Sequence, residues 1–360
     1  MAARSLVPDF SRPPFAGAPE ARFEPAPADA VLPEGFFCTS NLPTYVRVGA
    51  RWILPARARM DGVVVRRGAE LETVEPRQVR AGEPVVVGLA EDGSEGVVVY
   101  GGGFLDAVAS PNEFRFMATE VSRERPANYE EMAGRLEQER RAGGYLLWVV
   151  GPALVHSRAR ADFEWFVHHG YVQAVLVGNA VAVHDIEAAI YGTTLGMTSE
   201  GKAASAGHGL HMRAINRVAA AGSIERAVEQ GLVTSGIMRA LVAERIPYVL
   251  AGSIRDDGPL PGVLTDTIAA QDAMRAHTTR ATGAVLVATA LHAIAVGNML
   301  PAFHTRRGAP EPLMTICVDQ TEFVVSKLRD RGTHQAYGVV TNAQDFMHVL
   351  RSYTEKCRRS

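Results

Sequence analysis

Lysine is scarce in this sequence of 360 residues, and its scarcity narrows the possible chemistry. The only lysines are Lys202, Lys327 and Lys356. An enzyme that forms a Schiff base needs a lysine inside a pocket. Lys327 falls in an amphipathic helical segment and Lys356 in the C-terminal tail, which leaves Lys202 in a loop rich in Gly, Ala and Ser. The sequence therefore speaks against a mechanism based on pyridoxal phosphate.

Other absences narrow the class of protein and its compartment. Cys38, Cys317 and Cys357 are far apart and form no CxxC, so we expect a reducing, cytoplasmic location rather than a disulfide framework. No run reaches the roughly 18 apolar residues of a membrane span, and the N-terminus lacks the features of a secretory signal. A net charge of −2 gives no reason to expect nucleic acid or an anionic membrane as a partner.

Several familiar catalytic and binding motifs are also missing. No G-x-S-x-G occurs, and no G-x-G-x-x-G follows a predicted strand, so a dinucleotide would require a variant of the Rossmann fold. His208 and His211 lie three residues apart and could face one site from a helix start. They have no carboxylate or cysteine partner at a supporting spacing, and we therefore predict no metal site.

The patterns that are present divide the chain into four parts. Residues 1–34 are rich in Pro, Ala and Arg without periodicity, which indicates a flexible or draped arm. Residues 35–112 hold short β-type runs between glycine-containing turns and predict a small β-rich domain. A connecting helix is expected within 113–143. In 144–355 strands alternate with helices, which predicts an α/β domain with a Rossmann-like parallel sheet flanked by helices.

Small or polar residues follow each of the six predicted strands of this domain. In open α/β sheets, ligands bind outside the carboxyl ends of the strands. Glycines there let the backbone approach a pyrophosphate, and helix N-termini supply N–H donors to it. The residues expected along this edge are Gly151, Pro152, Asn179, Ser253, Asp256, Asp257, Thr289, His292, Asp319 and Asn342.

Two acidic residues near this edge allow two interpretations each. Asp319 ends a predicted strand before a helix, where an acid either binds a ribose hydroxyl or caps the helix. Asp185 follows His184 at the start of another helix and is either a cap or a ligand contact. The loop SIRDDGPLPG, after the run Tyr248–Ala251, is either an active-site wall or a surface loop with solvated aspartates.

Several stretches resemble one known family. SNLPTYVRVGARWI, MDGVVV, VGNAVAVHDIEAAIYGT, PYVLAGSIRDDGPLPGVLTD and ATALHAIAVGNMLP are similar to the LOR/SDH-type ornithine cyclodeaminase family. This family also forms the C-terminal half of arginine dihydrolase/ornithine cyclodeaminase fusions and is unrelated to the μ-crystallin-type cyclodeaminases. The resemblance covers residues 36–350 in order, and SIRDDGPLP with AVGNMLP is its most specific part.

The resemblance implies a reaction and a cofactor. A modified Rossmann domain would bind NAD⁺, and a small β-rich domain would help to bind the substrate. L-ornithine would become L-proline and ammonia: the Cα–H gives a hydride to NAD⁺, the δ-amine attacks the imine, ammonia leaves and the hydride returns. The cofactor must then stay bound through the cycle. The expected partners are a small basic amino acid and further copies of the chain, as a dimer or tetramer.

The resemblance fixes neighbourhoods, and residue type suggests roles within them. The candidates for proton transfer are Asp256, Asp257 and His292. Because adjacent aspartates cannot easily point the same way, one of the pair is expected to face the substrate or the nicotinamide and the other to bind backbone or a helix start. The substrate-binding candidates are Asn41, Thr44, Arg47, Arg213 and Asp266, with the arginines suited to the carboxylate. The cofactor-binding candidates are Gly151, Pro152, Asn179, Ala180, Asp185, Ser253, Thr289, Asn298, Met299, Asp319 and Asn342.

The segment GHGLHM at 207–212 departs from the family pattern, which is more basic and richer in histidine there. A basic amino acid related to ornithine would therefore fit equally well as substrate. Two other functions remain open at this point. One is a dehydrogenase that uses the same hydride chemistry and releases NADH. The other is an NAD-binding regulator without catalysis, against which the intact SIRDDGPLP and AVGNMLP runs argue.

Overall fold

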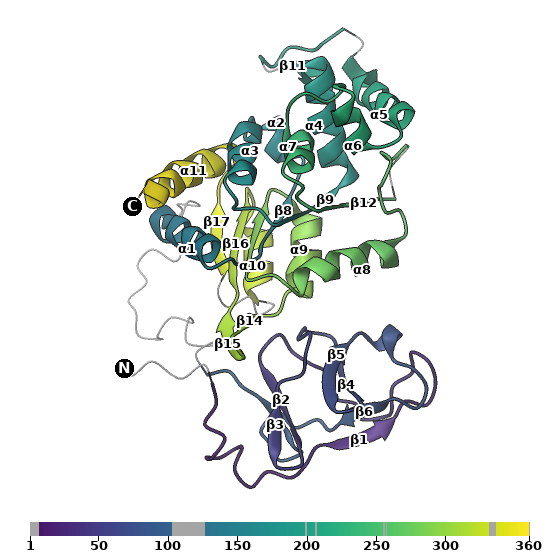
Figure 1. Cartoon of the computed structure of the whole chain (residues 1–360), viewed down its shortest axis with the longest axis vertical. Helices are drawn as coiled ribbons and strands as arrows, with labels where there is room; N and C mark the ends of the chain where they lie inside the picture. Colours follow the sequence, from purple (N-terminus) through teal and green to yellow (C-terminus); the bar gives the residue numbers. More distant parts are fainter. Residues whose placement is uncertain are drawn as a thin grey trace. The chain divides into compact units, whose positions relative to one another are not determined.

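The computed structural model divides the chain into two compact units (Figure 1). The β unit comprises Met1–Ala118, Asn298–Leu313 and Asp330–Gln335, and the Rossmann unit comprises Thr119–Gly297, Met314–Arg329 and Ala336–Ser360. The structure describes residues 7–102, 127–198, 200–205, 207–254, 256, 258–330 and 336–359.

A six-stranded parallel sheet forms the centre of the Rossmann unit. Its strands, in spatial order, are β12 (Tyr248–Ala251), β9 (Ala174–Gly178), β8 (Leu146–Val150), β13 (Gly283–Val287), β16 (Met314–Asp319) and β17 (Ala336–Val340). Taken in chain order this is 3-2-1-4-5-6, the Rossmann order, so the strand order reverses between β8 and β13. Every residue of these two central strands is buried, as expected for a sheet covered on both faces. The predicted fold class is confirmed.

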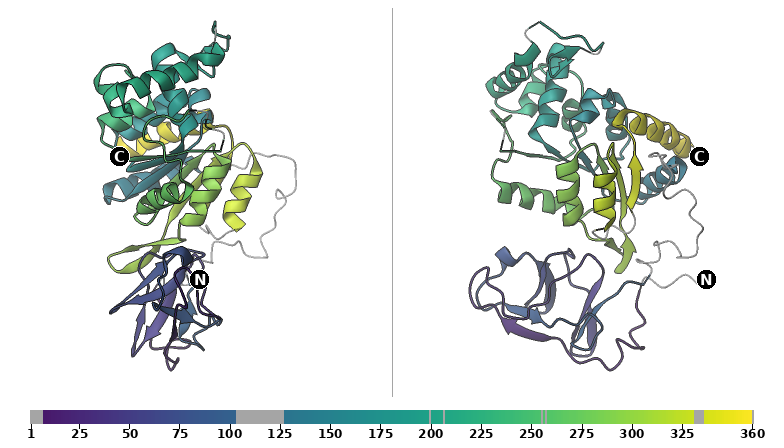
Figure 2. Two further views of the ribbon diagram at one scale, coloured as in Figure 1. Left: turned by 90° about the vertical axis from the view of Figure 1, so that its right-hand side faces the viewer. Right: turned by 180° about the vertical axis from the view of Figure 1, so that it is seen from behind.

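Helices lie on both sides of this sheet (Figure 2). They are α1 (Tyr129–Arg141), α2 (Ala153–His156), α3 (Arg160–His168), α4 (Asn179–Tyr191), α5 (Leu210–Ala221), α6 (Ile224–Glu229), α7 (Ile237–Ala243), α8 (Thr267–Thr278), α9 (Ala290–Met299), α10 (Glu322–Asp330) and α11 (Ala343–Arg359). A short hairpin, β10 (Thr193–Thr194) with β11 (Met197–Thr198), follows α4. No helix in the described part of the chain is long and apolar enough to cross a membrane.

Two features of the structure differ from the sequence-based expectation for this unit. One helix was expected across 153–170, but the chain breaks between α2 and α3, where Arg158 has a φ of +67°. A hairpin of β14 (Phe303–Arg306) and β15 (Ala309–Pro312) was not expected, and it clusters with the β unit although the sequence placed it in the 144–355 domain. Its turn residues Arg307 and Gly308 both have positive φ, as a two-residue hairpin turn requires.

The described part of the β unit contains two antiparallel sheets, a 3-10 turn at Pro76–Gln78 and the hairpin of β14 and β15. One sheet has the order β1 (Arg22–Pro25), β6 (Pro84–Val87), β4 (Val63–Arg67) and β5 (Glu70–Val74). The other has the order β3 (Arg51–Ile53), β2 (Thr44–Val48) and β7 (Val97–Val99). Valines of both sheets are buried together, with Val46 and Val64 in one cluster. The predicted β-rich character of 35–112 therefore holds for the residues described.

The segment expected to be a flexible arm contributes to this unit. Arg22–Pro25 is the strand β1, which pairs with β6. Phe15 is buried, and its ring packs edge-on against Tyr45 and Trp52. The composition argument missed this because a four-residue edge strand and one buried aromatic residue leave no periodic pattern.

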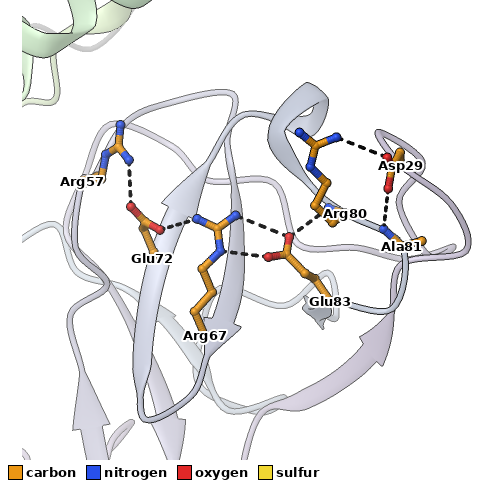
Figure 3. Close-up of polar contacts among 7 residues, drawn as sticks. All are labelled: Asp29, Arg57, Arg67, Glu72, Arg80, Ala81 and Glu83. Atoms are coloured by element: carbon orange, nitrogen blue, oxygen red, sulfur yellow. Dashed lines mark hydrogen bonds and ion pairs between the residues drawn. The ribbon is translucent and has the colours of Figure 1, made fainter.

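A chain of exposed ion pairs holds part of the arm to the sheet (Figure 3). Arg67 bonds to Glu72 at 2.7 Å and to Glu83 at 2.9 Å. Asp29, which belongs to the arm, accepts a hydrogen bond from the Ala81 N–H at 2.9 Å and pairs with Arg80 at 3.2 Å. Exposed ion pairs of this kind contribute little individually, typically about 0–1 kcal/mol. They fix the position of the arm more than they stabilise the unit.

Candidate functional site

The candidate site lies at the carboxyl edge of the Rossmann sheet, where β8 and β13 end side by side. The Gly151 N–H donates to the Val287 carbonyl at 2.9 Å. A Cβ atom on Gly151 would lie 1.8 Å from the Ala288 carbonyl oxygen. Only glycine fits there, because the two strand ends approach each other closely. Gly151 thus allows β8 and β13 to end close together at the switch point.

Two of the longer helices that begin at this edge carry no acidic residue in their first turn. Neither α4, which follows β9, nor α9, which follows β13, has an acidic residue in its first turn. The N-cap of α4, Gly178, also provides no side-chain cap. By contrast, α10 and α11, which follow the outer strands β16 and β17, carry Glu322 and Asp345 in their first turns. The positive helix ends at the switch point are therefore suited to an anionic group.

Asn179 connects two parts of this edge. It is the first residue of α4, directly after β9, and it is buried. Its Oδ1 accepts a hydrogen bond from the Leu260 N–H at 3.2 Å, which ties the loop after β12 to the end of β9. Rossmann domains often place an acid that binds the ribose after the second strand. Here that position holds an amide, and Ala180 follows it in the first turn of α4.

His292 lies over the end of β9, in the first turn of α9. A Cβ atom on Gly178 would lie 2.8 Å from Cε1 of this ring, so the glycine makes room for the histidine. Burial lowers the pKa of His292 below its usual value of 6.5. The ring is therefore neutral at pH 7 and able to accept a proton. The structure thus brings one predicted proton-transfer residue to the edge where α4 and α9 begin.

Of the two adjacent aspartates, the structure describes Asp256, whereas Asp257 lies outside the described residues. Oδ2 of Asp256 accepts a hydrogen bond from the Ser253 N–H at 2.7 Å, and the Asp256 N–H donates to the Ser253 carbonyl at 3.3 Å. Asp256 therefore closes a local turn after β12. Because Asp257 lies outside the described residues, the expected division of roles between the two aspartates stays a prediction.

Asp185 was expected to contact the cofactor, but its contacts are structural. The side chain is fully buried and pairs with Arg160 at 2.5 Å. Its two oxygens accept hydrogen bonds from the Ile237 N–H at 2.9 Å and the Met238 N–H at 2.8 Å. It thereby caps α7, whose own N-cap Gly236 provides no side-chain cap. This arrangement joins α4 to α7 and corrects the predicted role.

Two other predicted site residues cap helices, and a third closes a turn before one. Asp266, expected to bind the distal amine of the substrate, accepts from the Ala269 N–H at 2.7 Å at the start of α8. Oδ1 of Asp319 accepts from both the N–H and the hydroxyl of Thr321, which closes a turn just before α10, and its contact with a ribose stays a prediction. Asn342 accepts from the Asp345 N–H at 2.8 Å before α11. Short polar side chains after a strand serve equally well as helix caps, which is why the sequence pattern was ambiguous.

The predicted substrate residues of the β unit separate into two groups. Asn41 and Thr44 are buried; the Asn41 carbonyl accepts from the Ala302 N–H at 3.0 Å, and the Thr44 hydroxyl donates to the Leu42 carbonyl at 3.2 Å. Arg47 donates to the backbone carbonyls of Ala18 and Gly49. Its binding of a carboxylate stays a prediction.

The remaining predicted residues lie in several places. Pro152 is the N-cap of α2, and Thr289 directly precedes α9. Asn298 and Met299 form the C-terminal end of α9. Oδ1 of Asn298 is buried and has no hydrogen-bond partner among the residues that the structure describes. A buried acceptor without a partner calls for an explanation, and a bound group is one. Arg213 is exposed on α5.

Three apolar side chains at this edge were missed by the sequence analysis. Ile254, Leu291 and Phe323 follow β12, β13 and β16 within a few residues, and all three are well exposed. Exposed large apolar groups gathered near one edge mark a surface that a ligand or another part of the protein covers. The sequence does show an apolar residue shortly after each of these strands. Amphipathic helices produce the same pattern, so the sequence alone did not indicate that these side chains are exposed.

Two cavities of the Rossmann unit lie at the opposite, amino-terminal ends of the strands. One has about 550 Å³ and is lined by Tyr248 and Pro247, which begin β12. The other has about 490 Å³ and is lined by Tyr145 and Gln173, just before β8 and β9. Ligands of open α/β sheets bind at the carboxyl ends, so these cavities are not the expected active site. No group of three or more His, Cys, Asp or Glu side chains among the described residues could hold a metal ion.

Both units match one family of known sequences. Residues 130–350 match the Rossmann-fold region of the family described as arginine dihydrolase ArgZ-like, C-terminal. Residues 43–130 match the first region of the same C-terminal part. The matched regions cover most of the chain and both units.

Named relatives are similar over nearly the whole chain. An ornithine cyclodeaminase from Methanopyrus kandleri is 42% identical over 344 residues, which cover 92% of this chain and 77% of that protein. A second, from Methanocaldococcus jannaschii, is 40% identical over 94% of this chain and 79% of its own length. The bifunctional arginine dihydrolase/ornithine cyclodeaminase AgrE of a Nostoc species is 37% identical, and the match covers 94% of this chain and 47% of that protein.

Solved structures agree with these relations. The crystal structure of a LOR/SDH protein from Methanococcus maripaludis has a TM-score of 0.85 at 38% identity and covers 94% of this chain and 99% of that one. AgrE, solved as a ternary complex with ornithine and NAD⁺, has a TM-score of 0.58 at 34% identity, covering 94% of this chain and 46% of that one. The resemblance seen in the sequence is confirmed: the chain belongs to the ArgZ-like C-terminal family, together with the archaeal proteins named ornithine cyclodeaminase.

Proposed function

We propose that the protein is an NAD⁺-dependent cyclodeaminase that converts L-ornithine, or a related basic amino acid, to L-proline, or the corresponding cyclic imino acid, and ammonia. The observation that carries the proposal is the pair of helix N-termini without acidic residues, α4 and α9, beside the reversal of strand order. The names of the archaeal relatives and the complex of AgrE with ornithine and NAD⁺ support the same reaction.

The residues at the carboxyl edge fit a dinucleotide. Backbone N–H groups of α4 and α9 would hold the pyrophosphate, because no acidic side chain in either first turn competes for them. Leu291 and Phe323 offer exposed apolar surface to flat rings at the same edge. When bound, NAD⁺ supplies a hydride acceptor for the substrate's Cα and returns the hydride at the end of the cycle.

Proton transfer falls to His292 in this proposal. The α-ammonium group must lose a proton before Cα can be oxidised, and departing ammonia must gain one. A neutral imidazole does the first and, once protonated, the second. Burial keeps the pKa of His292 low, so the ring is in the accepting form at pH 7. Asp256 is held by backbone and is therefore the weaker candidate of the two described groups.

The cell context in this proposal is a cytoplasmic homo-oligomer that contributes to proline synthesis. Cys38, Cys317 and Cys357 are all free thiols, which suits a reducing compartment. Sedimentation of the purified protein would test the oligomer: a chain that stays monomeric at micromolar concentration would contradict that part.

The central test follows a deuterium label. Ornithine deuterated at Cα is incubated with the protein and NAD⁺, alongside a panel of other basic amino acids, and the products are identified by mass spectrometry. The proposal expects the label to reappear at Cα of proline, with no net NADH. NADH formed once per turnover would mean a net dehydrogenase instead. If NAD⁺ binds but no basic amino acid is turned over, the remaining interpretation is an NAD-binding regulator without catalysis.

A further inference from the structure

A buried carboxylate near the end of α4 has no part in the proposed chemistry. Glu187 is fully buried, and four polar groups meet its two oxygens. Oε1 accepts hydrogen bonds from the Thr193 hydroxyl and the Gly196 N–H, both at 2.9 Å. Oε2 accepts from the Leu195 N–H at 3.1 Å and lies 3.3 Å from Nδ1 of His184. Glu187 thus fixes the turn of the β10–β11 hairpin to α4.

Glu187 is charged despite its burial. Burial alone would raise the pKa of this carboxyl, but its hydrogen bonds outweigh burial and hold the pKa below its usual value. A buried carboxylate satisfied in this way specifies one position for the groups that donate to it. Its contacts therefore constrain residues 193–196 more tightly than exposed hairpin contacts would.

The turn that Glu187 holds is packed against the segment that begins α5. Gly196 has a φ of +70°, and a Cβ atom on it would lie 2.4 Å from the carbonyl carbon of Gly207. The Gly196 carbonyl accepts from the Ala204 N–H at 2.8 Å, and the Gly207 N–H donates to the Ala204 carbonyl at 3.0 Å. Gly207–Gly209 is a 3-10 turn that leads directly into α5. Because no side chain separates the two backbones, a shift of Gly196 displaces the start of α5.

The first turn of α5 lies beside the loop that follows β12. A Cβ atom on Gly258 would lie 3.5 Å from Cε of Met212. The same loop is tied to the end of β9, since the Leu260 N–H donates to Asn179. The start of α5 therefore adjoins the carboxyl edge, next to the run SIRDDGPLPG, and all of these contacts lie within the Rossmann unit.

Arg213 brings a positive charge to this first turn. Its Nε lies 4.0 Å from the position of a Cβ atom on Gly209, so the side chain runs back along α5 toward the start of the helix. No hydrogen bond or ion pair joins Arg213 to another described residue. The first turn of α5 carries no acidic residue, so nothing on the helix itself neutralises the guanidinium. A guanidinium can bind both oxygens of a carboxylate, which makes Arg213 suited to that group of an amino acid.

We infer that Glu187 is a positioning residue for the substrate: it holds the hairpin turn against α4 and thereby keeps Arg213, at the start of α5, in place to bind the α-carboxylate. The inference rests on the proposed function, because it takes an amino acid as the substrate. Glu187 is buried under the hairpin and does not itself touch the substrate. Its loss should therefore weaken substrate binding, and the effect should pass through Arg213.

The test is a double-mutant cycle of Glu187→Gln and Arg213→Gln, with ornithine as substrate and NAD⁺ in excess. Arg213→Gln should raise the KM for ornithine about 10-fold or more, the usual size for a lost charge-assisted hydrogen bond, and leave kcat within a few-fold. Glu187→Gln keeps the size of the side chain but turns an NH₂ group toward N–H donors, so it should also raise KM with little change in kcat. If Glu187 acts through Arg213, the double variant should have the KM of Arg213→Gln alone.

Glu137→Gln is the matched control. Glu137 is a buried carboxylate of α1 that accepts from Tyr171 at 2.6 Å and from Arg140 at 2.7 Å. This variant should lower the melting temperature as Glu187→Gln does, but leave the KM for ornithine unchanged. Gly196→Ala displaces Gly207 directly, so it should reproduce the rise in KM, and it serves if Glu187→Gln does not fold.

Amide hydrogen exchange gives a measurement that does not depend on turnover. Glu187→Gln should speed exchange in residues 193–198 and 207–213 and leave the start of α9 unchanged. The inference would be overturned by KM increases that multiply in the double variant, or by an unchanged KM in folded Arg213→Gln or Glu187→Gln. A wild-type protein that acts on no basic amino acid would overturn the proposed function; unchanged exchange in residues 207–213 would separately show that Glu187 does not position the start of α5.

Discussion

Individual side chains at the carboxyl edge have separable roles, and His292 is the one whose role depends on pH. In the proposed function its neutral form is the proton acceptor. Burial lowers the pKa of this ring below 6.5, so the neutral form persists to lower pH than it would in a free histidine. The chemistry at His292 should therefore weaken only as pH falls below 6.5.

This assignment predicts the effect of His292→Asn. We expect kcat to fall by about 10²-fold or more, the usual size of a general acid–base contribution. NAD⁺ affinity should change little, and the acidic limb of the kcat–pH profile should disappear in the variant. A variant that keeps both its turnover and its acidic limb would show that another group accepts the proton.

Gly151 gives a prediction about stability at the same edge. In Gly151→Ala the new methyl group would meet the Ala288 carbonyl, a backbone atom that cannot move aside easily. We expect a loss of about 2 kcal/mol or more in the free energy of unfolding, measured by denaturant titration. Gly134→Ala on α1 is the control. No atom lies within 4 Å of its added Cβ, so it should stabilise the protein by roughly 0.5–1 kcal/mol.

The sequence predicted the strands that end at this edge but could not assign each side chain on it. Strand ends are visible because buried parallel strands are continuous apolar runs, which placed Gly151 and His292. The roles of Asp185 and Asp266 depended on which helix start each carboxylate meets, and that is decided by tertiary packing. Arg47 shows the same limit. It stands in β-type sequence, where the sequence alone does not indicate which groups an arginine side chain contacts.

At the scale of elements, α4 and α7 are held together by a single carboxylate. Asp185 combines an ion pair to Arg160 with two hydrogen bonds to the start of α7, and all of these contacts are buried. Removing one partner of such a pair leaves an uncompensated charge on the other.

Asp185→Ala is therefore expected to lower the free energy of unfolding by about 3 kcal/mol or more. At a temperature where the variant remains folded, its affinity for NAD⁺ should match the wild type within a few-fold. Asp266→Ala, which removes an exposed cap from α8, should cost about 1 kcal/mol. The opposite result would contradict this structural role. If folded Asp185→Ala loses much of its NAD⁺ affinity but little stability, Asp185 contacts the cofactor, as its position in the sequence suggested.

Element prediction succeeded where the pattern was long and failed where it was short. The six buried strands were found because each is an apolar run with a polar end. The break at Arg158 and the hairpin β14–β15 were missed, since both depend on backbone conformations with positive φ at residues other than glycine. Strand β1 was missed because its partner β6 lies about sixty residues away in the chain.

For the whole molecule, the division into two units predicts where NAD⁺ protects the backbone. A ligand that binds the native state at a hundred times its Kd stabilises it by about 2.7 kcal/mol. If NAD⁺ lies at the carboxyl edge of the Rossmann sheet, amide hydrogen exchange should slow at the starts of α4 and α9 and at the ends of β8 and β13. The sheet β1–β6–β4–β5 of the β unit should gain little direct protection. Protection by NAD⁺ alone that is confined to the β unit would contradict the site at the switch point, whatever reaction the protein catalyses.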